Sequence, residues 1–147
     1  MGDPSLVTGV PEIRPYRADD RAAIIALWRD IFSDEPVWND PDLTIDRKQS
    51  VQAELFLVAC SEAEVIGTVL AGFDGVRGWV HRLAVHADHR RQGIAAALMA
   101  RAEAGLKAIG CPKLNLQVRA SNEQVVQFYK SLGYQVEARI SLGKALD

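Results

Sequence analysis

The sequence feature that most constrains the fold is the stretch 85–98, where a strand-like segment gives way to a basic turn, a glycine and an alanine-rich helix. The turn contains Arg90, Arg91 and Gln92, and the helix begins directly after Gly93. The first N–H groups of a helix have no intrahelical partner and lie at the positive end of its dipole, so they stabilise an anion. Gly93 lets an anion approach the backbone, because it carries no Cβ. The stretch therefore predicts a strand–turn–helix unit that binds a phosphate-like anion.

The composition predicts one globular domain. The chain has 147 residues, of which 48% are apolar and 24% charged, as is typical of a soluble protein. We expect a flexible N-terminal tail at 1–11, because Gly, Pro, Ser and Thr are mixed there without periodicity. We expect a single domain at 12–147. The net charge of −2 argues against a general nucleic-acid binder. No apolar run approaches the ~18 residues that cross a bilayer, and no signal-peptide pattern is present, so we expect a cytoplasmic protein without membrane association.

The cysteines and histidines do not predict a metal site or a disulfide. Cys60 and Cys111 are isolated in the sequence, and we expect two reduced thiols. His81, His86 and His89 run from a strand into a turn without an acidic partner at ligand spacing. We therefore predict that no metal is bound.

Hydrophobic periodicity and turn residues predict the order of the elements. In the first part of the chain they indicate a short edge strand at 12–16, a helix that starts at Asp19 and Asp20, a second helix from Asp40 to about Val51, and strands at 55–60, 65–73 and 79–85. After these they indicate the helix after Gly93, a strand at 114–118, a helix from a capping box at 121–124 to Gly133, and strand-like residues at 134–146.

Two of these elements carry a clear prediction of which side chains are buried. The helix after Gly93 has one apolar stripe, formed by Ile94, Leu98, Ala102, Leu106 and Ile109. Strict alternation in 79–85 separates one face, with Trp79, His81, Leu83 and Val85, from the other, with Val80, Arg82 and Ala84. The run at 55–60 is continuously apolar, which favours a strand covered on both faces.

Two segments resemble signatures of the GNAT (Gcn5-related N-acetyltransferase) family. Residues 90–95 are similar to its Arg/Gln-x-x-Gly-x-Gly/Ala acetyl-CoA signature, and residues 128–134 to its Phe-Tyr-x-x-Leu-Gly-Phe/Tyr signature. Two signatures in the right order are far more specific than one glycine-rich turn. Segments 38–41, 47–48, 74–78 and 141–144 further resemble small bacterial acetyltransferases of the YpeA type, so the resemblance covers roughly residues 12–146. It implies the GNAT fold, an α/β (or α+β) fold with a mixed, mostly antiparallel central sheet and helices on both faces.

The resemblance implies acetyl-CoA as co-substrate, with no metal. The residues that it assigns to acetyl-CoA binding are Leu83, Ala84, Val85, Arg90, Arg91, Gln92, Gly93, Ile94, Ala95, Asn122 and Tyr129. A main-chain N–H near Val85 would polarise the acetyl carbonyl, as in an oxyanion hole. The acceptor amine would then attack the thioester directly, without a side-chain nucleophile.

The resemblance also suggests Tyr129 as the general acid that protonates the departing thiolate. A thiol of pKa ~8.5 leaves fairly well unaided, so a phenol of pKa ~10 adds on the order of 10²-fold at most. A core aromatic is the alternative, because the spacing of Tyr129 from Val125 and Leu132 is also core spacing.

The general base is less well defined by the sequence. The related ribosomal-protein N-terminal acetyltransferases carry a glutamate where this chain has Gln117, and an amide cannot accept the proton. His81 is the nearest titratable alternative, acting through water with Asp74 behind it. A structural strand histidine is an equally good interpretation of His81.

Four residues are candidates for acceptor binding: Trp38, Asp74, Arg77 and Gln117. A simpler interpretation is that these residues only form turns or carry solvated charge.

We predict an N-acetyltransferase that acts on a primary amine of a small molecule or peptide. The sequence leaves the assembly state open, and a homodimer is one possibility. A catalytically weak acyl-CoA sensor and a partner-binding scaffold are the competing interpretations.

Overall fold

The computed structural model describes residues 11–33 and 35–146. The chain divides into two compact units, one that ends at Leu116 and one that begins at Gln117, and each is described by itself. Of the tail predicted at 1–11, only Pro11 lies within the described residues, and it belongs to no element. The single domain at 12–147 stays a prediction.

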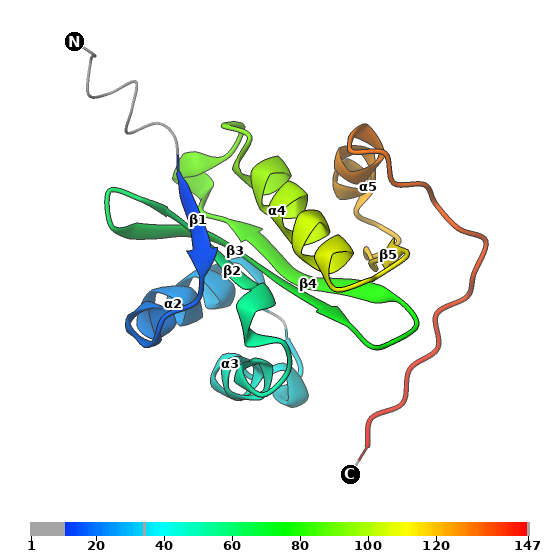
Figure 1. The fold of residues 1–147 in the computed structure, drawn as a ribbon, viewed down its shortest axis with the longest axis horizontal. Helices are drawn as coiled ribbons and strands as arrows, with labels where there is room; N and C mark the ends of the chain where they lie inside the picture. The colour runs from blue at the N-terminus through cyan, green and yellow to red at the C-terminus, as the bar shows by residue number, and fades with distance from the viewer. Residues whose placement is uncertain (1–10, 34, 147) are drawn as a thin grey trace. The chain divides into compact units, whose positions relative to one another are not determined.

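The first unit is built on a five-stranded sheet in the order β1-β2-β3-β4-β5 (Figure 1). Strands β1 (Glu12–Pro15), β2 (Phe56–Ser61), β3 (Glu64–Phe73) and β4 (Gly78–Val85) pair antiparallel, and β5 (Leu114–Asn115) runs parallel to β4. This mixed, mostly antiparallel sheet confirms the predicted fold. Residues Phe56 to Cys60 of β2 are all buried, which confirms a strand covered on both faces.

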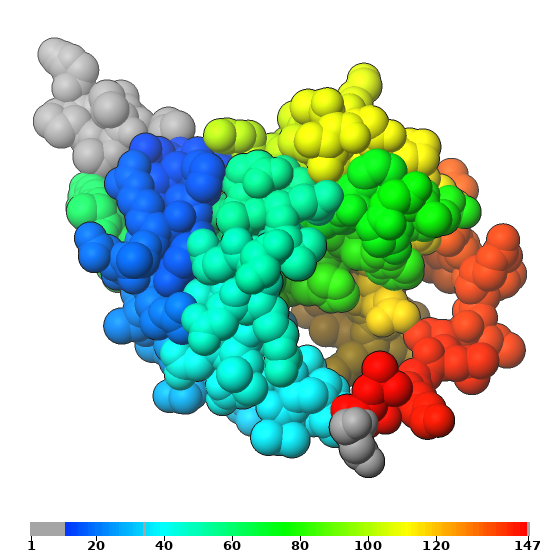
Figure 2. All heavy atoms as spheres, turned by 60° about the horizontal axis from the view of Figure 1, so that its bottom comes forward, coloured from blue at the N-terminus to red at the C-terminus, as the bar shows by residue number. Residues whose placement is uncertain are grey.

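Helices cover both faces of this sheet (Figure 1). Helices α2 (Arg21–Ile31) and α3 (Pro41–Gln49) lie on one face, and α4 (Ile94–Ala108) lies on the other. The core under α2 contains Ile24, Trp28 and Phe56, each fully buried. Figure 2 shows α2 (blue) and α3 (cyan) side by side on the surface.

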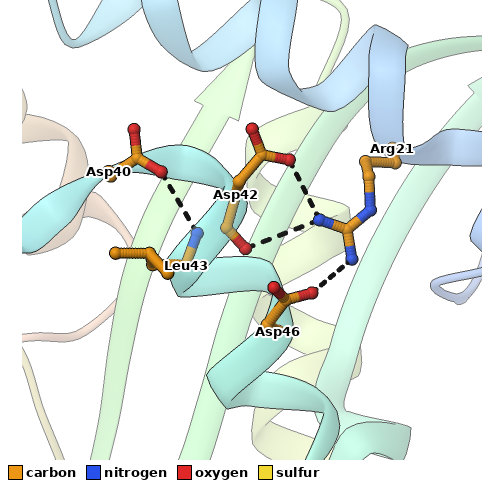
Figure 3. Close-up of polar contacts among 5 residues, drawn as sticks. All are labelled: Arg21, Asp40, Asp42, Leu43 and Asp46. Atoms are coloured by element: carbon orange, nitrogen blue, oxygen red, sulfur yellow. Dashed lines mark hydrogen bonds and ion pairs between the residues drawn. The ribbon is translucent and has the colours of Figure 1, made fainter.

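Charged side chains join α2 to α3 (Figure 3). The guanidinium of Arg21 lies 3.1 Å from a carboxylate oxygen of Asp42 and 2.6 Å from one of Asp46. Asp40 accepts a hydrogen bond from the Leu43 N–H at 3.3 Å and caps the start of α3, which confirms the predicted cap. Exposed ion pairs stabilise little individually, but these two contacts fix where α3 begins relative to α2. The connection between the two helices includes the short 3₁₀ turn η2 (Val37–Asn39).

Three predictions about the segments after residue 93 are wrong. The strand expected at 114–118 covers only Leu114–Asn115, and the described residues 134–146 contain no strand. Alternating apolar residues are not sufficient for a strand, because a strand also needs a neighbour that completes its hydrogen-bond ladder. Ile109 lies beyond the end of α4 and is 43% exposed, although Ile94, Leu98, Ala102 and Leu106 are buried as predicted.

The second unit contains helix α5 (Glu123–Ser131). Its N-cap is Asn122, whose side chain accepts a hydrogen bond from the Val125 N–H at 3.4 Å. The predicted capping box at 121–124 is therefore wrong, because the cap is one residue later than Ser121. Gly133 ends the helix at φ 97°, as predicted.

Both cysteines of the chain are free thiols, with Cys60 buried and Cys111 partly exposed. Among the described residues, no helix combines the length and the apolar character that a membrane span needs.

An ion pair at the start of α2 generates a prediction about stability. Asp20 is buried, and its carboxylate lies 2.8 Å from the Arg14 guanidinium and accepts from the Arg17 N–H at 2.8 Å. Burial alone would raise the pKa of Asp20, but these two donors hold it below its ordinary value. The stabilisation is therefore present above the unfolded-state pKa of ~3.9 and is lost as the pH falls through the folded-state pKa.

We expect Asp20→Asn to lower the free energy of unfolding at pH 7 by roughly 3 kcal/mol, because the substitution leaves the Arg14 charge without its partner. Urea unfolding measures this change. The neighbouring Asp19→Asn is the matched control, because Asp19 is exposed, and its effect should stay within about 0.5 kcal/mol. Equal effects of the two substitutions would contradict the prediction.

Candidate active site

The start of α4 is an open backbone site. Gly93 is the N-cap residue at φ 78°, and no side chain caps this end of the 15-residue helix. The Ala97 N–H donates to the Gly93 carbonyl at 3.0 Å, so the N–H groups of Ile94, Ala95 and Ala96 precede the first helical hydrogen bond. A Cβ built on Gly93 would meet no atom within 4 Å. This end of α4 therefore offers unpaired donors and free space to a ligand.

The turn before α4 presents its cationic groups to solvent. Arg90, Arg91 and Gln92 are all exposed. The Arg90 Nε–H donates to the Val85 carbonyl at 3.3 Å, and Arg91 adopts a left-handed φ of 65°. Arg90 is thus held across the turn, and the positive charge of both arginines lies next to the end of the helix that attracts anions.

Strand β4 contains a bulge that the sequence did not predict. Thr68 pairs with Ala84 and Leu70 pairs with His81, so Arg82 and Leu83 together oppose the single residue Val69. Ala84, and not Leu83, therefore continues the face of His81. The predicted grouping of Trp79 and His81 with Leu83 and Val85 is wrong, because the extra residue reverses the alternation.

A buried polar network holds the bulge against α2. The Trp28 indole N–H donates to the Thr68 hydroxyl oxygen at 2.9 Å, and the Thr68 hydroxyl donates to the Arg82 carbonyl at 2.8 Å. The Arg82 guanidinium donates to a Glu35 carboxylate oxygen at 3.1 Å and to the Asn39 carbonyl at 2.7 Å. Burial lowers the pKa of Arg82, and the charge of Glu35 partly offsets this effect.

Next to this network, a cavity of about 410 Å³ opens between the end of α2 and the start of α3. Its lining includes Trp28, Phe32, Glu35, Asn39, Asp40 and Arg82. Sequence analysis missed Glu35, Asn39 and Arg82. The one signal in the sequence was the charge of Arg82. The predicted alternation puts Arg82 on the same strand face as Val80 and Ala84, which are apolar and buried.

His81 lies on the same sheet face as α3, close to Lys48. The pKa of the His81 imidazole lies below its ordinary value because of partial desolvation and, secondarily, the positive charges of Lys48 and Arg82. The Lys48 ammonium donates to the Ala71 carbonyl at 2.5 Å, and burial lowers its pKa. His81 is therefore neutral at pH 7 and can accept a proton.

The structure gives Asp74 a different partner from the one predicted. Its carboxylate accepts from the backbone N–H groups of Val76 and Arg77, both at 2.8 Å, and these bonds lower its pKa. No hydrogen bond joins Asp74 to His81 in the described structure. Asp74 shapes the β3–β4 turn, and Arg77 in the same turn is exposed.

Trp38 is 58% exposed and does not line the cavity. Its carbonyl accepts from the Arg47 guanidinium at 3.2 Å. The exposed indole is free to meet an acceptor at the surface of η2, next to the cavity wall formed by Val37 and Asn39.

Three predicted residues belong to the second unit. Tyr129 is buried, and its ring contacts those of Phe128 and Tyr134 edge to face, at centroid distances of 5.1 and 5.6 Å. Burial raises the pKa of Tyr129 to about 12, so its hydroxyl keeps its proton at pH 7. The Asn122 amide oxygen caps α5, and the Gln117 amide donates to the Ser141 hydroxyl oxygen at 2.6 Å.

Residues 22–134 match the sequence profile of the Acetyltransferase (GNAT) family. The chain belongs to this family. An acetyltransferase of Pectobacterium atrosepticum is 46% identical over 135 residues, which cover 92% of this chain and 95% of the relative. The solved structure of Ard1 from Thermoplasma volcanium has a TM-score of 0.76 at 21% identity and covers 88% of this chain and 85% of its own. An aminoglycoside N-acetyltransferase solved with CoA has a TM-score of 0.75 at 16% identity, covering 92% and 94% of the two chains. The protein is an acetyltransferase of the GNAT type.

The environment of His81 generates a prediction for titration. We expect its imidazole to titrate below the ordinary value of about 6.5, and Lys48→Met to raise this pKa, because one of the two nearby positive charges is removed. NMR titration of the histidine ring measures both values. Lys107→Met on the opposite face of the sheet is the control and should leave the His81 titration unchanged. A pKa of His81 that does not respond to Lys48→Met would contradict the proposed charge coupling.

Proposed function

We propose that this protein transfers the acetyl group of acetyl-CoA to a primary amine of a small molecule or peptide. The observation that carries the proposal is the start of α4, where Gly93 leaves backbone donors without a side-chain cap and space for a ligand. Pyrophosphate suits this position, because its negative charge meets both the N–H groups and the helix dipole. The CoA complex of the similar aminoglycoside N-acetyltransferase supports the same ligand class.

The residues proposed to hold CoA fall into three groups. The backbone of Leu83–Val85 would bind the pantetheine arm, and residues 90–95 would bind the pyrophosphate. Asn122 and Tyr129 complete the set on the strength of the family signatures. Asn122 already caps α5 with its side-chain oxygen, so its amide N–H₂ is the group that would reach a ligand.

The proposed reaction needs no covalent enzyme intermediate. The neutral amine attacks the thioester carbonyl carbon, a main-chain N–H near Val85 stabilises the oxyanion, and the C–S bond then breaks. The sulfur takes a proton from the Tyr129 hydroxyl, and the new amide loses one proton from its nitrogen. With a pKa of about 12, Tyr129 is protonated at pH 7 but a weak acid, so its contribution is limited.

Proton removal from the acceptor favours an amine of lowered pKa. A lysine-like amine of pKa ~10.4 costs about 4.6 kcal/mol to deprotonate at pH 7, and an α-amine of pKa ~8 costs about 1.4 kcal/mol. Gln117 cannot accept this proton, and a His81 of lowered pKa is a weak base. We therefore propose a water-relayed path through His81 and an acceptor that is easily deprotonated.

The cavity beside Arg82 is the proposed place for the acceptor, with Trp38 at its edge. Asp74 and Arg77 are secondary candidates, since Asp74 is engaged by its own turn. Gln117, in place of a carboxylate, favours a second candidate function, a weakly catalytic acyl-CoA sensor. The two functions differ in turnover, not in CoA binding.

Gly93→Glu tests the CoA site. At a concentration 100-fold above Kd, CoA should stabilise the wild type by about 2.7 kcal/mol, and the substitution should abolish this gain because it adds bulk and negative charge at the proposed pyrophosphate position. Thermal unfolding with and without CoA measures the effect. Gly75→Glu is the matched control, because Gly75 also has a positive φ and open space around its Cα. CoA stabilisation that persists in Gly93→Glu would contradict the assignment.

A panel of amines tests acetyl transfer. We expect release of CoA, detected as free thiol, with at least one primary amine, and faster turnover with α-amines than with ε-amines at pH 7 because less deprotonation is needed. A clear preference for ε-amines would contradict the lowered-pKa acceptor.

Tyr129→Phe separates the two candidate functions. In an enzyme it should lower kcat by on the order of 10²-fold at most and keep most of the CoA stabilisation, because only the hydroxyl of the ring is removed. If the wild type releases no thiol with any amine while CoA still stabilises both proteins, the sensor is the correct interpretation.

A further inference from the structure

Arg82 has a backbone conformation that needs support. Its φ of 56° is in the left-handed region, which a residue with a long side chain rarely adopts inside a strand. It is also the first of the two residues that oppose Val69 in the bulge of β4. Such a conformation persists only where surrounding contacts determine it.

The backbone of Arg82 is held from one side. Its carbonyl accepts from the Thr68 hydroxyl, which in turn accepts from the Trp28 indole N–H. Thr68 and Trp28 are both fully buried, so no water replaces these bonds. This network fixes the bulge to α2 and to the centre of the sheet.

The side chain of Arg82 is held by a different part of the chain. It is 8% exposed, and its guanidinium carbon lies 4.9 Å from the ring centroids of both Trp28 and Phe32. Its two terminal nitrogens donate to the carboxylate of Glu35 and the carbonyl of Asn39. Glu35 and Asn39 line the cavity between α2 and α3. One side chain therefore joins the wall of the cavity to the bulge.

We propose that Arg82 is a positioning residue that couples the cavity wall at 35–39 to the backbone of Leu83–Val85. This rests on the proposed function, in which that backbone polarises the thioester. Leu83 follows Arg82 directly, so a rotation at Arg82 reorients the peptide groups after it. A ligand that moves Glu35 or Asn39 also moves the Arg82 guanidinium, which is bonded to both. It thereby changes the geometry of these peptide groups.

The forked shape of the guanidinium is essential to this role. Arg82 reaches two acceptors at once and lies against two aromatic rings. A lysine ammonium is a compact point charge without the planar fork, so it cannot reproduce this arrangement. Arg82→Lys therefore keeps the charge and loses the positioning, whereas a residue needed only for charge would be rescued by lysine.

The test compares Arg82→Gln and Arg82→Lys with Arg29→Gln. Arg29 also lines the cavity, but it is exposed, and its side chain has no hydrogen bond or ion pair to another described residue. Its substitution removes the same charge from the cavity without disturbing the bulge. Steady-state kinetics at a temperature well below unfolding give kcat and KM for acetyl-CoA and for the amine.

We expect kcat to fall by about 10- to 100-fold in both Arg82 variants, with a much smaller change in the KM for acetyl-CoA. Lys107→Gln, which removes an exposed charge on α4 at the opposite face of the sheet, should keep kcat within about twofold, whereas Arg29→Gln in the cavity wall should change mainly the KM for the amine. A kcat near the wild-type value in Arg82→Gln, with only a lower unfolding temperature, would show a purely structural role and overturn the proposal.

Amide hydrogen exchange gives a second readout that does not depend on turnover. We expect the amides of Leu83–Val85 to exchange at least about tenfold faster in Arg82→Gln than in the wild type and in Arg29→Gln. Glu35→Gln, which keeps an oxygen acceptor, serves if the Arg82 variants do not fold, and should show a smaller change in the same amides. Unchanged exchange overturns the proposal. Altered exchange in a protein that transfers acetyl to no amine would uphold the coupling and reject the proposed function.

Discussion

The hydrogen bonds that run from the Trp28 indole through the Thr68 hydroxyl to the Arg82 carbonyl are the interaction on which the first unit depends. A buried hydroxyl without partners would cost about 1–3 kcal/mol, so this network is stable only while α2, β3 and β4 keep their relative positions. It also supports the one residue of β4 with a left-handed φ. The network holds the bulge at Arg82 and Leu83, and the bulge places Ala84, in place of Leu83, on the sheet face of His81.

One part of the candidate active site is built from contacts between residues close in the sequence, and the other part from contacts between residues far apart. The turn at 86–93 and the start of α4 are built largely from contacts between residues close in the sequence, such as the bond from Arg90 to Val85, and the bond from the His86 N–H to the Ile66 carbonyl is a longer-range contact. The cavity beside Arg82 is not local: Glu35 lies 47 positions from Arg82, and residues of α2, of the segment before α3 and of β4 line it together. The proposed cofactor site therefore depends on local chain geometry, and the proposed acceptor cavity depends on packing between elements.

Most of the elements could be predicted because their signals are local as well. Asp40 before Pro41 marked the start of α3, and Gly93 and Gly110 marked the ends of α4. The predictions failed where the structure depends on which other group a strand or a side chain pairs with. Residues 134–146 alternate like a strand but have no ladder, and the face of Leu83 was reversed by one extra residue opposite Val69. Asp74 was expected behind His81, whereas the backbone N–H groups of Val76 and Arg77 in its own turn donate to its carboxylate.

The sequence by itself determined the family, the order of the main elements and the glycine at the uncapped start of α4. Each of these depends on short-range chemistry: capping, glycine conformation and hydrophobic period. Only the tertiary structure decided that Arg82, Glu35 and Asn39 meet at one cavity, that burial and then the charges of Lys48 and Arg82 lower the pKa of His81, and that β4 bulges where it does. Those features arise from contacts between residues far apart in the chain, and their energies depend on burial and distance, which a sequence pattern does not contain.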